Sequence, residues 1–313
     1  MSAVTPAPQV PVTAEDIRTE APKNGGRKSR KVEPLYYLFL LPVLILFSLA
    51  ITVPGLVGIF FSFTDSIGIG TWNFHGFTNY IAIFSDPAIL RAYLFTFGFA
   101  LITVFVVNMI SFMLAVLLTS RIRFKVTLRT IFVIPMVISG IIIAYVFNFL
   151  FANSVPAAGS ALGISWLETS LLANANWAWL TIVIVTAWQA IPGTLLIYIA
   201  GILSIPGDVY EAADIDGASR GQQLLRITIP LVFGYVVINF IIGFKNFLNA
   251  YDIIVGLTNG GPGTATRSIA MTIITGFNSG DYAYQMANAT IFFIVTIIIS
   301  LIQLSLTRGR NAF

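Results

Sequence analysis

The chain has 313 residues, of which 57% are hydrophobic and 10% are charged, and its formal net charge is +4. Because a soluble globular domain carries about 25% charged residues, this composition excludes an ordinary soluble fold. The sequence holds no cysteine and one histidine, which excludes disulfides, cysteine nucleophiles and multi-histidine metal sites. We therefore expect no metal and no cofactor. The basic residues flank apolar segments as orientation signals do, so we also expect no nucleic-acid partner.

The N-terminal segment 1–34 is polar, rich in Pro, Ala and Thr, and ends in a basic cluster. We expect it to be a disordered cytoplasmic tail. A secretory signal is not predicted, because the apolar run that follows begins late and is too long.

Three long stretches without any charged residue follow, from Glu33 to Asp65, from Arg91 to Arg121 and from Arg129 to Glu168. Each exceeds the roughly 20 apolar residues that cross a bilayer core. The predicted fold is therefore an all-α, polytopic helical membrane protein. Its transmembrane domain covers residues 35–306 and is followed by a short cytoplasmic tail, 307–313. The six predicted transmembrane helices cover about residues 35–62, 92–119, 130–152, 177–203, 230–257 and 286–306.

The Lys and Arg residues predict the orientation, because cytoplasmic segments carry an excess of them. If the N-terminus is cytoplasmic, the inside segments are 1–34, 120–129, 204–229 and 307–313, and they hold 14 of the 17 basic residues. We therefore expect both termini to be cytoplasmic.

The inside segment 204–229 differs from the others because it is acidic and longer than a connection between antiparallel helices needs. Pro206-Gly207 is expected to end the preceding helix. The charged residues of the segment are Asp208, Glu211, Asp214, Asp216, Arg220 and Arg226.

Local signals in this segment predict two short helices joined by a sharp turn. Asp208 with Glu211 favours a capping-box-like helix start, and Gly217 favours the turn. Ser219 is expected to cap the second helix, and Pro230 suits the first turn of the next span. These signals leave two hypotheses open. The segment is either a rigid acidic element that is offered to a basic partner or a solvated helical hairpin.

The run from Glu211 to Ser219 reads Glu-Ala-Ala-Asp-Ile-Asp-Gly-Ala-Ser, and nine residues separate Gly217 from the later Ile227-Thr228-Ile229-Pro230. This pattern resembles the EAA motif, which marks the membrane subunits of binding-protein-dependent ABC importers. Other segments are similar to the oligosaccharide and glycerol-phosphate branch of these permeases. They are Leu41-Pro42, Ser62-Phe63-Thr64-Asp65, Gly76-Phe77-Thr78-Asn79-Tyr80, Leu203-Ser204-Ile205-Pro206, Tyr251-Asp252 and Leu257-Thr258-Asn259-Gly260-Gly261-Pro262.

The resemblance implies a type I ABC importer transmembrane domain in the bacterial cytoplasmic (inner) membrane. It implies a second, often non-identical permease subunit, two cytoplasmic ATPase subunits and an extracytoplasmic solute-binding protein, with a sugar or oligosaccharide as the solute. The ATPase-coupling residues that it implies are Glu211, Ala212, Ala213, Asp216, Gly217, Ile227 and Pro230. Because the chain has no G-x-x-x-x-G-K-[ST] phosphate loop, we expect no enzyme activity and an ATPase on a separate subunit.

A polar stripe is predicted in the fifth span, where Lys245, Asn249 and Asp252 would share one helix face. An ionisable group within a span favours a functional role, because its burial in lipid is costly. The stripe therefore lines a solute pathway or, in the alternative, holds the bundle together through a pair between Lys245 and Asp252. Five further mid-span side chains are predicted to form interhelical hydrogen bonds. They are Asn108, Ser111, Asn148, Gln189 and Asn239.

The turn Gly260-Gly261-Pro262-Gly263 follows this span. It is interpreted as a tight loop or, alternatively, as a contact for the binding protein. The expected mechanism is alternating access, in which an ATPase dimer rocks two permease subunits. A rival hypothesis is a secondary transporter driven by an ion gradient, which predicts inverted repeats and more acidic groups within the spans. A second rival is a structural or receptor-type membrane protein, which leaves the acidic segment unexplained.

Overall fold

The structure is a computed structural model that describes residues 34–120 and 124–308. The predictions for the two terminal tails therefore fall almost entirely outside the described residues. The described chain is helical apart from turns and one isolated antiparallel bridge between Thr64 and Phe74. The first elements are α1 (Pro34–Phe47), η1 (Ser48–Thr52), α2 (Val53–Phe61), α3 (Thr78–Ser85), α4 (Pro87–Thr119), α5 (Lys125–Val137), α6 (Gly140–Phe149), η2 (Leu150–Ser154) and α7 (Val155–Leu162). The remaining elements are η3 (Ser165–Leu167), η4 (Leu171–Ala173), α8 (Ala175–Leu203), α9 (Gly207–Ile215), α10 (Arg220–Gln223), η5 (Leu224–Thr228), α11 (Ile229–Leu248), α12 (Asp252–Thr258), α13 (Ile269–Asn278) and α14 (Tyr282–Arg308).

The chain divides into two compact units, Met1–Pro54 and Gly55–Phe313. In the described part of the first unit, every side chain from Leu38 to Pro54 is exposed. Apolar side chains on such a helix require a lipid or protein surface around them.

Within residues 34–120 and 124–308, six helical stretches are long and apolar enough to cross a membrane, which confirms the predicted all-α, six-span fold. The charge gaps therefore predicted the number of spans correctly. The stretches are Leu38–Phe61, Pro87–Thr119, Gly140–Leu162, Ala175–Leu203, Arg220–Leu248 and Tyr282–Ser305.

The third predicted span, 130–152, is wrong as a single helix. The chain breaks between α5 and α6, where Ile138 adopts an extended backbone conformation with ψ 137°. The side-chain amide of Gln189 on α8 donates to the Ile138 carbonyl at 3.1 Å. This bond satisfies a carbonyl that the break leaves without a helical partner. The break is stable inside an apolar run because a neighbouring helix supplies the missing donor.

The fifth predicted span, 230–257, is also divided. Helix α11 ends at Leu248, and α12 begins as a separate helix at Asp252. The prediction that Lys245, Asn249 and Asp252 share the face of one helix is therefore wrong, because Asp252 begins a different helix.

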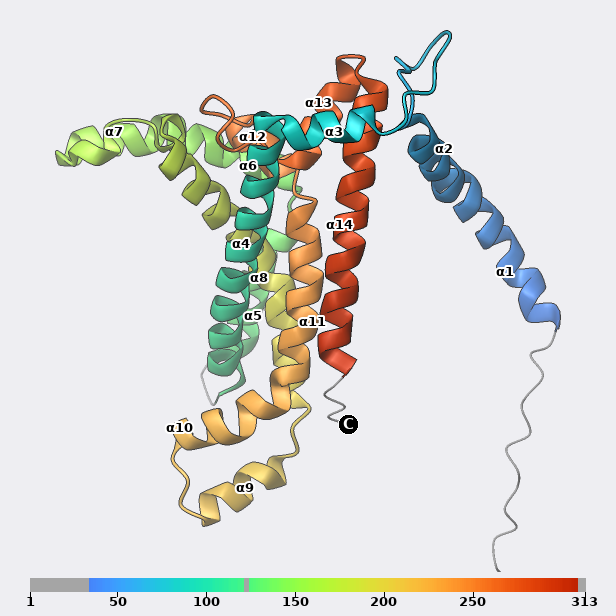
Figure 1. Cartoon of the computed structure of the whole chain (residues 1–313). Coiled ribbons are helices and arrows are strands. Elements are labelled where there is room, and N and C mark those ends of the chain that lie inside the picture. Colours follow the sequence, from blue (N-terminus) through green and yellow to red (C-terminus); the bar gives the residue numbers. More distant parts are fainter. Residues whose placement is uncertain (1–33, 121–123, 309–313) are drawn as a thin grey trace, which may run out of the picture. The chain divides into compact units, whose positions relative to one another are not determined.

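In the second unit, α4 packs on α8 and α11, and α14 lies beside α11 (Figure 1). A close approach of α8 and α11 occurs at Gly201, where an added Cβ would lie 2.7 Å from the Tyr235 ring. The five predicted interhelical hydrogen bonds are confirmed. Asn108 accepts from Tyr198 at 2.6 Å, Ser111 donates to Ile191 O at 3.2 Å, Asn148 to Leu257 O at 2.6 Å, Gln189 to Ile138 O at 3.1 Å and Asn239 to Thr194 O at 3.4 Å.

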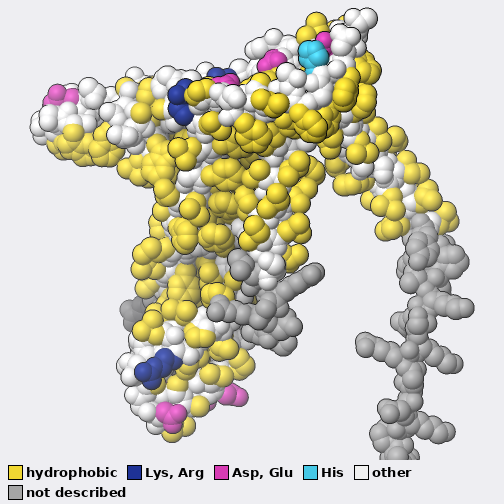
Figure 2. All heavy atoms as spheres, viewed as in Figure 1, with side chains coloured by type: hydrophobic (Ala, Val, Ile, Leu, Met, Phe, Trp, Pro, Cys, Tyr) yellow, Lys and Arg dark blue, Asp and Glu magenta, His cyan; other side chains and the backbone are white. Residues whose placement is uncertain are grey.

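The second unit has two polar ends. Helices α9 and α10 lie at one end, and α3, α12 and α13 lie at the other (Figure 1). Charged side chains gather at both ends, and an apolar surface separates them (Figure 2). At the α3 end, the carboxylate of Asp65 accepts from the backbone N–H of Asn73 at 2.5 Å and from its side-chain amide at 3.1 Å. These hydrogen bonds lower the pKa of Asp65 below its ordinary value of 3.8.

Candidate functional site

The 204–229 segment forms two short helices at the end of the second unit that is opposite α12 (Figure 1). The first helix, α9, starts after Pro206, which occupies the N-cap position and provides no side-chain cap. The predicted capping-box start at Asp208 and Glu211 is therefore wrong, because the helix begins one residue before Asp208. Asp208 instead lies in the first turn, where a carboxylate interacts favourably with the helix dipole.

The motif residues on α9 have different environments. Glu211 and Ala212 are exposed, and so is Asp216 at the end of the helix, whereas Ala213 is buried against the rest of the segment. The helix therefore presents a carboxylate and a small side chain outward while a second alanine packs inward. Further along the motif, Ile227 is half-buried and Pro230 is exposed.

The turn that follows α9 depends on Gly217, which has a φ of +73°. This left-handed conformation costs a residue with a Cβ roughly 1–2 kcal/mol. The N–H of Gly217 donates to Asp214 O at 3.1 Å, and the N–H of Ala218 donates to Ala213 O at 2.9 Å. These bonds satisfy the last carbonyls of α9.

The predicted cap of the second helix is confirmed. The Ser219 hydroxyl accepts from the N–H of Gln222 at 3.4 Å, and the Gln222 side chain accepts from the N–H of Ser219 at 2.8 Å. Together they form a complete capping box at the start of α10.

Two side-chain contacts that sequence reasoning missed join α9 to α10 and to the π-helical turn η5 that follows it. The amide of the buried Gln223 donates to Asp214 Oδ1 at 2.5 Å and to Ala218 O at 3.2 Å. The hydroxyls of Tyr210 and Thr228 lie 2.9 Å apart. The sequence shows a glutamine at 223 but does not show that it is buried, so it did not indicate these contacts. The segment is therefore a cross-braced unit.

The second helix, α10, continues into the following span without interruption. Helix α10, the π-helical turn η5 and α11 form one helical run, Arg220–Leu248. Pro230 is the second residue of α11, which begins directly after the π turn. Prolines and π turns are common causes of helix bends, and the run bends between α10 and α11 (Figure 1).

The residues predicted to line a solute pathway are only partly brought together. Lys245 and Asn249 are both exposed, and the Asn249 amide donates to the Lys245 carbonyl at 2.9 Å. Asp252 is exposed in the first turn of α12. The C-terminal end of α11 thus exposes the Lys245 ammonium and the Asn249 amide, and the Asp252 carboxylate lies at the start of the next helix.

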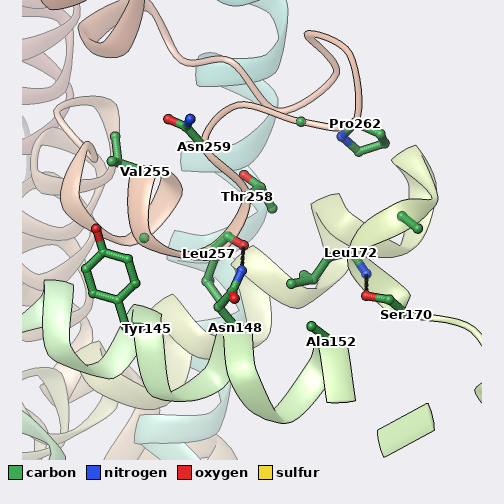
Figure 3. Close-up of a pocket in the computed structure, with 13 residues that line it drawn as sticks. Tyr145, Asn148, Ala152, Ser170, Leu172, Val255, Leu257, Thr258, Asn259 and Pro262 are labelled. Carbon is green, nitrogen blue, oxygen red and sulfur yellow. Dashed lines mark hydrogen bonds between the residues drawn. The ribbon is translucent and has the colours of Figure 1, made fainter.

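A groove of about 620 Å³ lies beyond this point, between α6, η4 and the C-terminal half of α12 (Figure 3). Its lining includes the turn that contains Gly261 and Pro262. That turn is held by the N–H of Gly261, which donates to Thr258 O at 2.8 Å. The lining residues are Tyr145, Asn148, Ala152, Ser170, Leu172, Ala173, Val255, Gly256, Leu257, Thr258, Asn259, Gly261 and Pro262.

Residues 108–312 match the family described as the inner membrane component of binding-protein-dependent transport systems. The chain belongs to this family. Membership in this transport family supports a permease subunit over an enzyme and over an ion-gradient-driven secondary transporter. Among the residues that the structure describes, no three His, Cys, Asp or Glu side chains are placed to hold a metal ion.

Named relatives in this family cover nearly the whole chain. The "Probable starch degradation products transport system permease protein AmyD" of Thermoanaerobacterium thermosulfurigenes is 34% identical over 88% of this chain and 94% of its own. The "Multiple sugar-binding transport system permease protein MsmF" of Streptococcus mutans is also 34% identical, over 89% of this chain and 98% of its own.

The fold matches a solved bacterial ABC transporter that is involved in the import of the acidic polysaccharide alginate. The TM-score is 0.78 at 23% sequence identity, with 88% of this chain and 96% of the other covered. This likeness establishes the importer permease fold.

Proposed function

We propose that this permease forms the membrane pathway of an ATP-driven importer for a sugar or oligosaccharide in the bacterial inner membrane. The sugar assignment is supported by relatives that are named as sugar transport permeases. Power would come from ATPase subunits on separate chains, through alternating access. The observation that carries the proposal is the 204–229 segment, which we call the coupling loop from here on.

The coupling loop has the properties expected of a segment that an ATPase subunit binds. The side chains of Gln223 and Tyr210 connect α9 to the helical run that follows it. A movement of α9 is therefore expected to carry this run with it. Glu211 stands exposed on α9 as a charged contact for a basic group of the ATPase. Ala212 beside it allows close approach.

The other partners follow from the family and from the accessible surfaces of the chain. A related alginate transporter has been solved in complex with an alginate pentasaccharide-bound periplasmic protein. An extracytoplasmic binding protein is therefore proposed for this chain as well. A second permease subunit would cover the apolar surface of Leu38–Pro54 and would complete the pathway.

The solute pathway is proposed to pass the end of α11. Lys245 and Asn249 lie exposed there, and Asp252 follows after the break in the helix. Hydroxyl groups of a sugar can accept from the ammonium and amide groups and donate to the carboxylate.

Charge reversal on α9 tests the coupling assignment. The variant Glu211→Arg in the assembled transporter is expected to abolish uptake and to detach the ATPase or free its hydrolysis from transport. Glu168→Arg is the matched control, because it makes the same change of charge on an exposed side chain outside the coupling loop. Full transport and intact assembly of Glu211→Arg would show that the coupling assignment is wrong.

The orientation can be tested directly, because the chain contains no cysteine. Single cysteines would be placed at Ile69, between α2 and α3, and at Ile215, the last residue of α9, which are both strongly exposed. Helices α3 and α9 lie at opposite ends of the second unit (Figure 1). In intact cells a membrane-impermeant maleimide is expected to label Ile69→Cys and to leave Ile215→Cys unlabelled. The reverse pattern would invert the proposed topology.

A further inference from the structure

We propose that the groove between α6, η4 and α12 is a carbohydrate-binding subsite, which a sugar unit occupies before it enters the membrane pathway. This inference rests on the proposed function for the direction of transport. The groove lies at the end of the second unit that is opposite the coupling loop (Figure 1). In the proposed orientation it therefore opens to the extracytoplasmic side.

The chemistry of the lining fits a neutral, hydroxyl-rich ligand. None of the lining residues carries a charge, and their polar groups are amides, hydroxyls and backbone groups. Tyr145, Leu172 and Pro262 add apolar surface (Figure 3). A sugar presents both kinds of surface, because its ring carries hydroxyls at the edge and C–H groups on the face. A charged ligand would find no counter-ion among the lining side chains.

Several polar groups in the groove retain hydrogen-bonding capacity. The Asn148 amide nitrogen donates to Leu257 O at 2.6 Å, which leaves its side-chain oxygen as an acceptor. The Ser170 hydroxyl accepts from the N–H of Leu172 at 3.3 Å and keeps its own hydrogen. Asn148 and Ser170 are held in place by the hydrogen bonds that they already make, so a ligand would meet donors and acceptors in fixed positions.

The walls of the groove are also held close together. Gly256 on α12 lies against α6, where an added Cβ would stand 2.5 Å from the Ala144 Cβ. The Asn148–Leu257 bond joins the same two helices. The volume of about 620 Å³ falls within the roughly 300–1,000 Å³ of pockets that hold compact ligands. A groove of this size takes a short oligosaccharide rather than a long chain.

A filling variant tests the subsite. Ala152 lines the groove and is half-buried, so Ala152→Trp would occupy it. Ala157→Trp is the matched control, because Ala157 is exposed on α7 and lies outside the lining. The purified permease in phosphatidylcholine nanodiscs, without ATP and without a binding protein, would be titrated with trehalose, maltotriose and galacturonate. Binding would be measured by saturation-transfer NMR.

The neutral sugars are expected to bind the wild type and Ala157→Trp alike, and to lose at least five-fold in affinity with Ala152→Trp. Galacturonate, which is anionic, is expected to bind at least five-fold more weakly than the neutral sugars. The inference is overturned if neither neutral sugar binds the wild type, or if Ala152→Trp binds them unchanged. In either case, sugar uptake by the assembled transporter would show that the proposed function survives without this subsite.

A Tyr145→Ala variant keeps the proposal falsifiable if Ala152→Trp fails to fold. Tyr145 is exposed, so its truncation should leave the fold intact. A loss of neutral-sugar binding of at least three-fold is expected. Unchanged binding would argue against the groove as the site.

Discussion

Asp214 on α9 accepts a hydrogen bond from the side chain of Gln223 on α10, and this bond closes the coupling loop across its turn. Gln223 is 5% exposed although it belongs to a helix of four residues on the surface. The burial shows that the two helices pack as one piece. The stiffness of that piece can be measured.

Removal of this bond should weaken the transfer of force through the loop. Asp214→Ala removes the carboxylate acceptor of the buried Gln223 amide and leaves it the Ala218 carbonyl. We expect fewer solute molecules carried per ATP, by about two- to five-fold, with the ATPase still bound. Asp214→Asn keeps an oxygen acceptor and should retain most of the coupling. Equal coupling ratios for the two variants would count against a mechanical role for this bond.

Gly217 makes a separate prediction about the turn itself. An added Cβ at Gly217 would meet no atom within 4 Å, so a substitution there acts through the backbone alone. Gly217→Ala should cost roughly 1 kcal/mol of loop stability, and Gly217→Asn should cost less, because asparagine tolerates the left-handed region better. ATPase co-purification would be compared for both variants. A worse result for asparagine than for alanine would contradict the backbone explanation.

Gly201 and Tyr235 should be coupled in stability. An added methyl at Gly201 would overlap the Tyr235 ring, and overpacking of this kind costs roughly 1–3 kcal/mol. Gly201→Ala should lower the melting temperature of the purified permease, and Gly201→Ala with Tyr235→Leu should recover part of the loss. If the stability loss of the double variant equals or exceeds the sum of the losses of the two single variants, the contact is not the cause.

The buried hydroxyl of Tyr198 is expected to contribute a measurable amount to bundle stability. It donates to Asn108 Oδ1 at 2.6 Å between α8 and α4. Tyr198→Phe should cost about 0.5–2 kcal/mol, because hydrogen bonds between membrane helices have modest net values. Denaturation in mixed micelles would measure the loss. The neighbouring Tyr235→Phe is the control, since the Tyr235 hydroxyl makes only a long contact of 3.4 Å to Ser204.

The loop around Asp65 should respond to acid. The folded pKa of its carboxyl lies below 3.8, so its contribution to stability is fully present above that value and is lost as the pH falls through the folded pKa. A nitroxide label on Ile69→Cys should become more mobile in electron paramagnetic resonance spectra below pH 3.8. The same label in an Asp65→Asn background should show no such step. A step that persists there would assign it to another group.

The number of spans and the Ser219 cap could be predicted from sequence, because charge gaps and capping residues act over short stretches of chain. The break at Ile138 could not, because the residues around it are apolar and its missing donor comes from Gln189, 51 positions later. The end of α11 was hidden for the same reason, since Ile253, Ile254 and Leu257 continue the apolar pattern into α12. The misplaced start of α9 has a local cause, because Pro206-Gly207 allows the helix to begin before the acidic residue.

One helical run connects the coupling loop to the opposite end of the second unit. The run Arg220–Leu248 has 29 residues, and α11 alone is about 30 Å long at 1.5 Å per residue. A rotation of roughly 5° at the bend beside Pro230 therefore displaces Leu248 by roughly 3 Å. Three residues separate Leu248 from α12, which forms one wall of the groove. A movement at the coupling loop is thus expected to change the width of the groove at the opposite end of the second unit, through one helical run and the short connection 249–251.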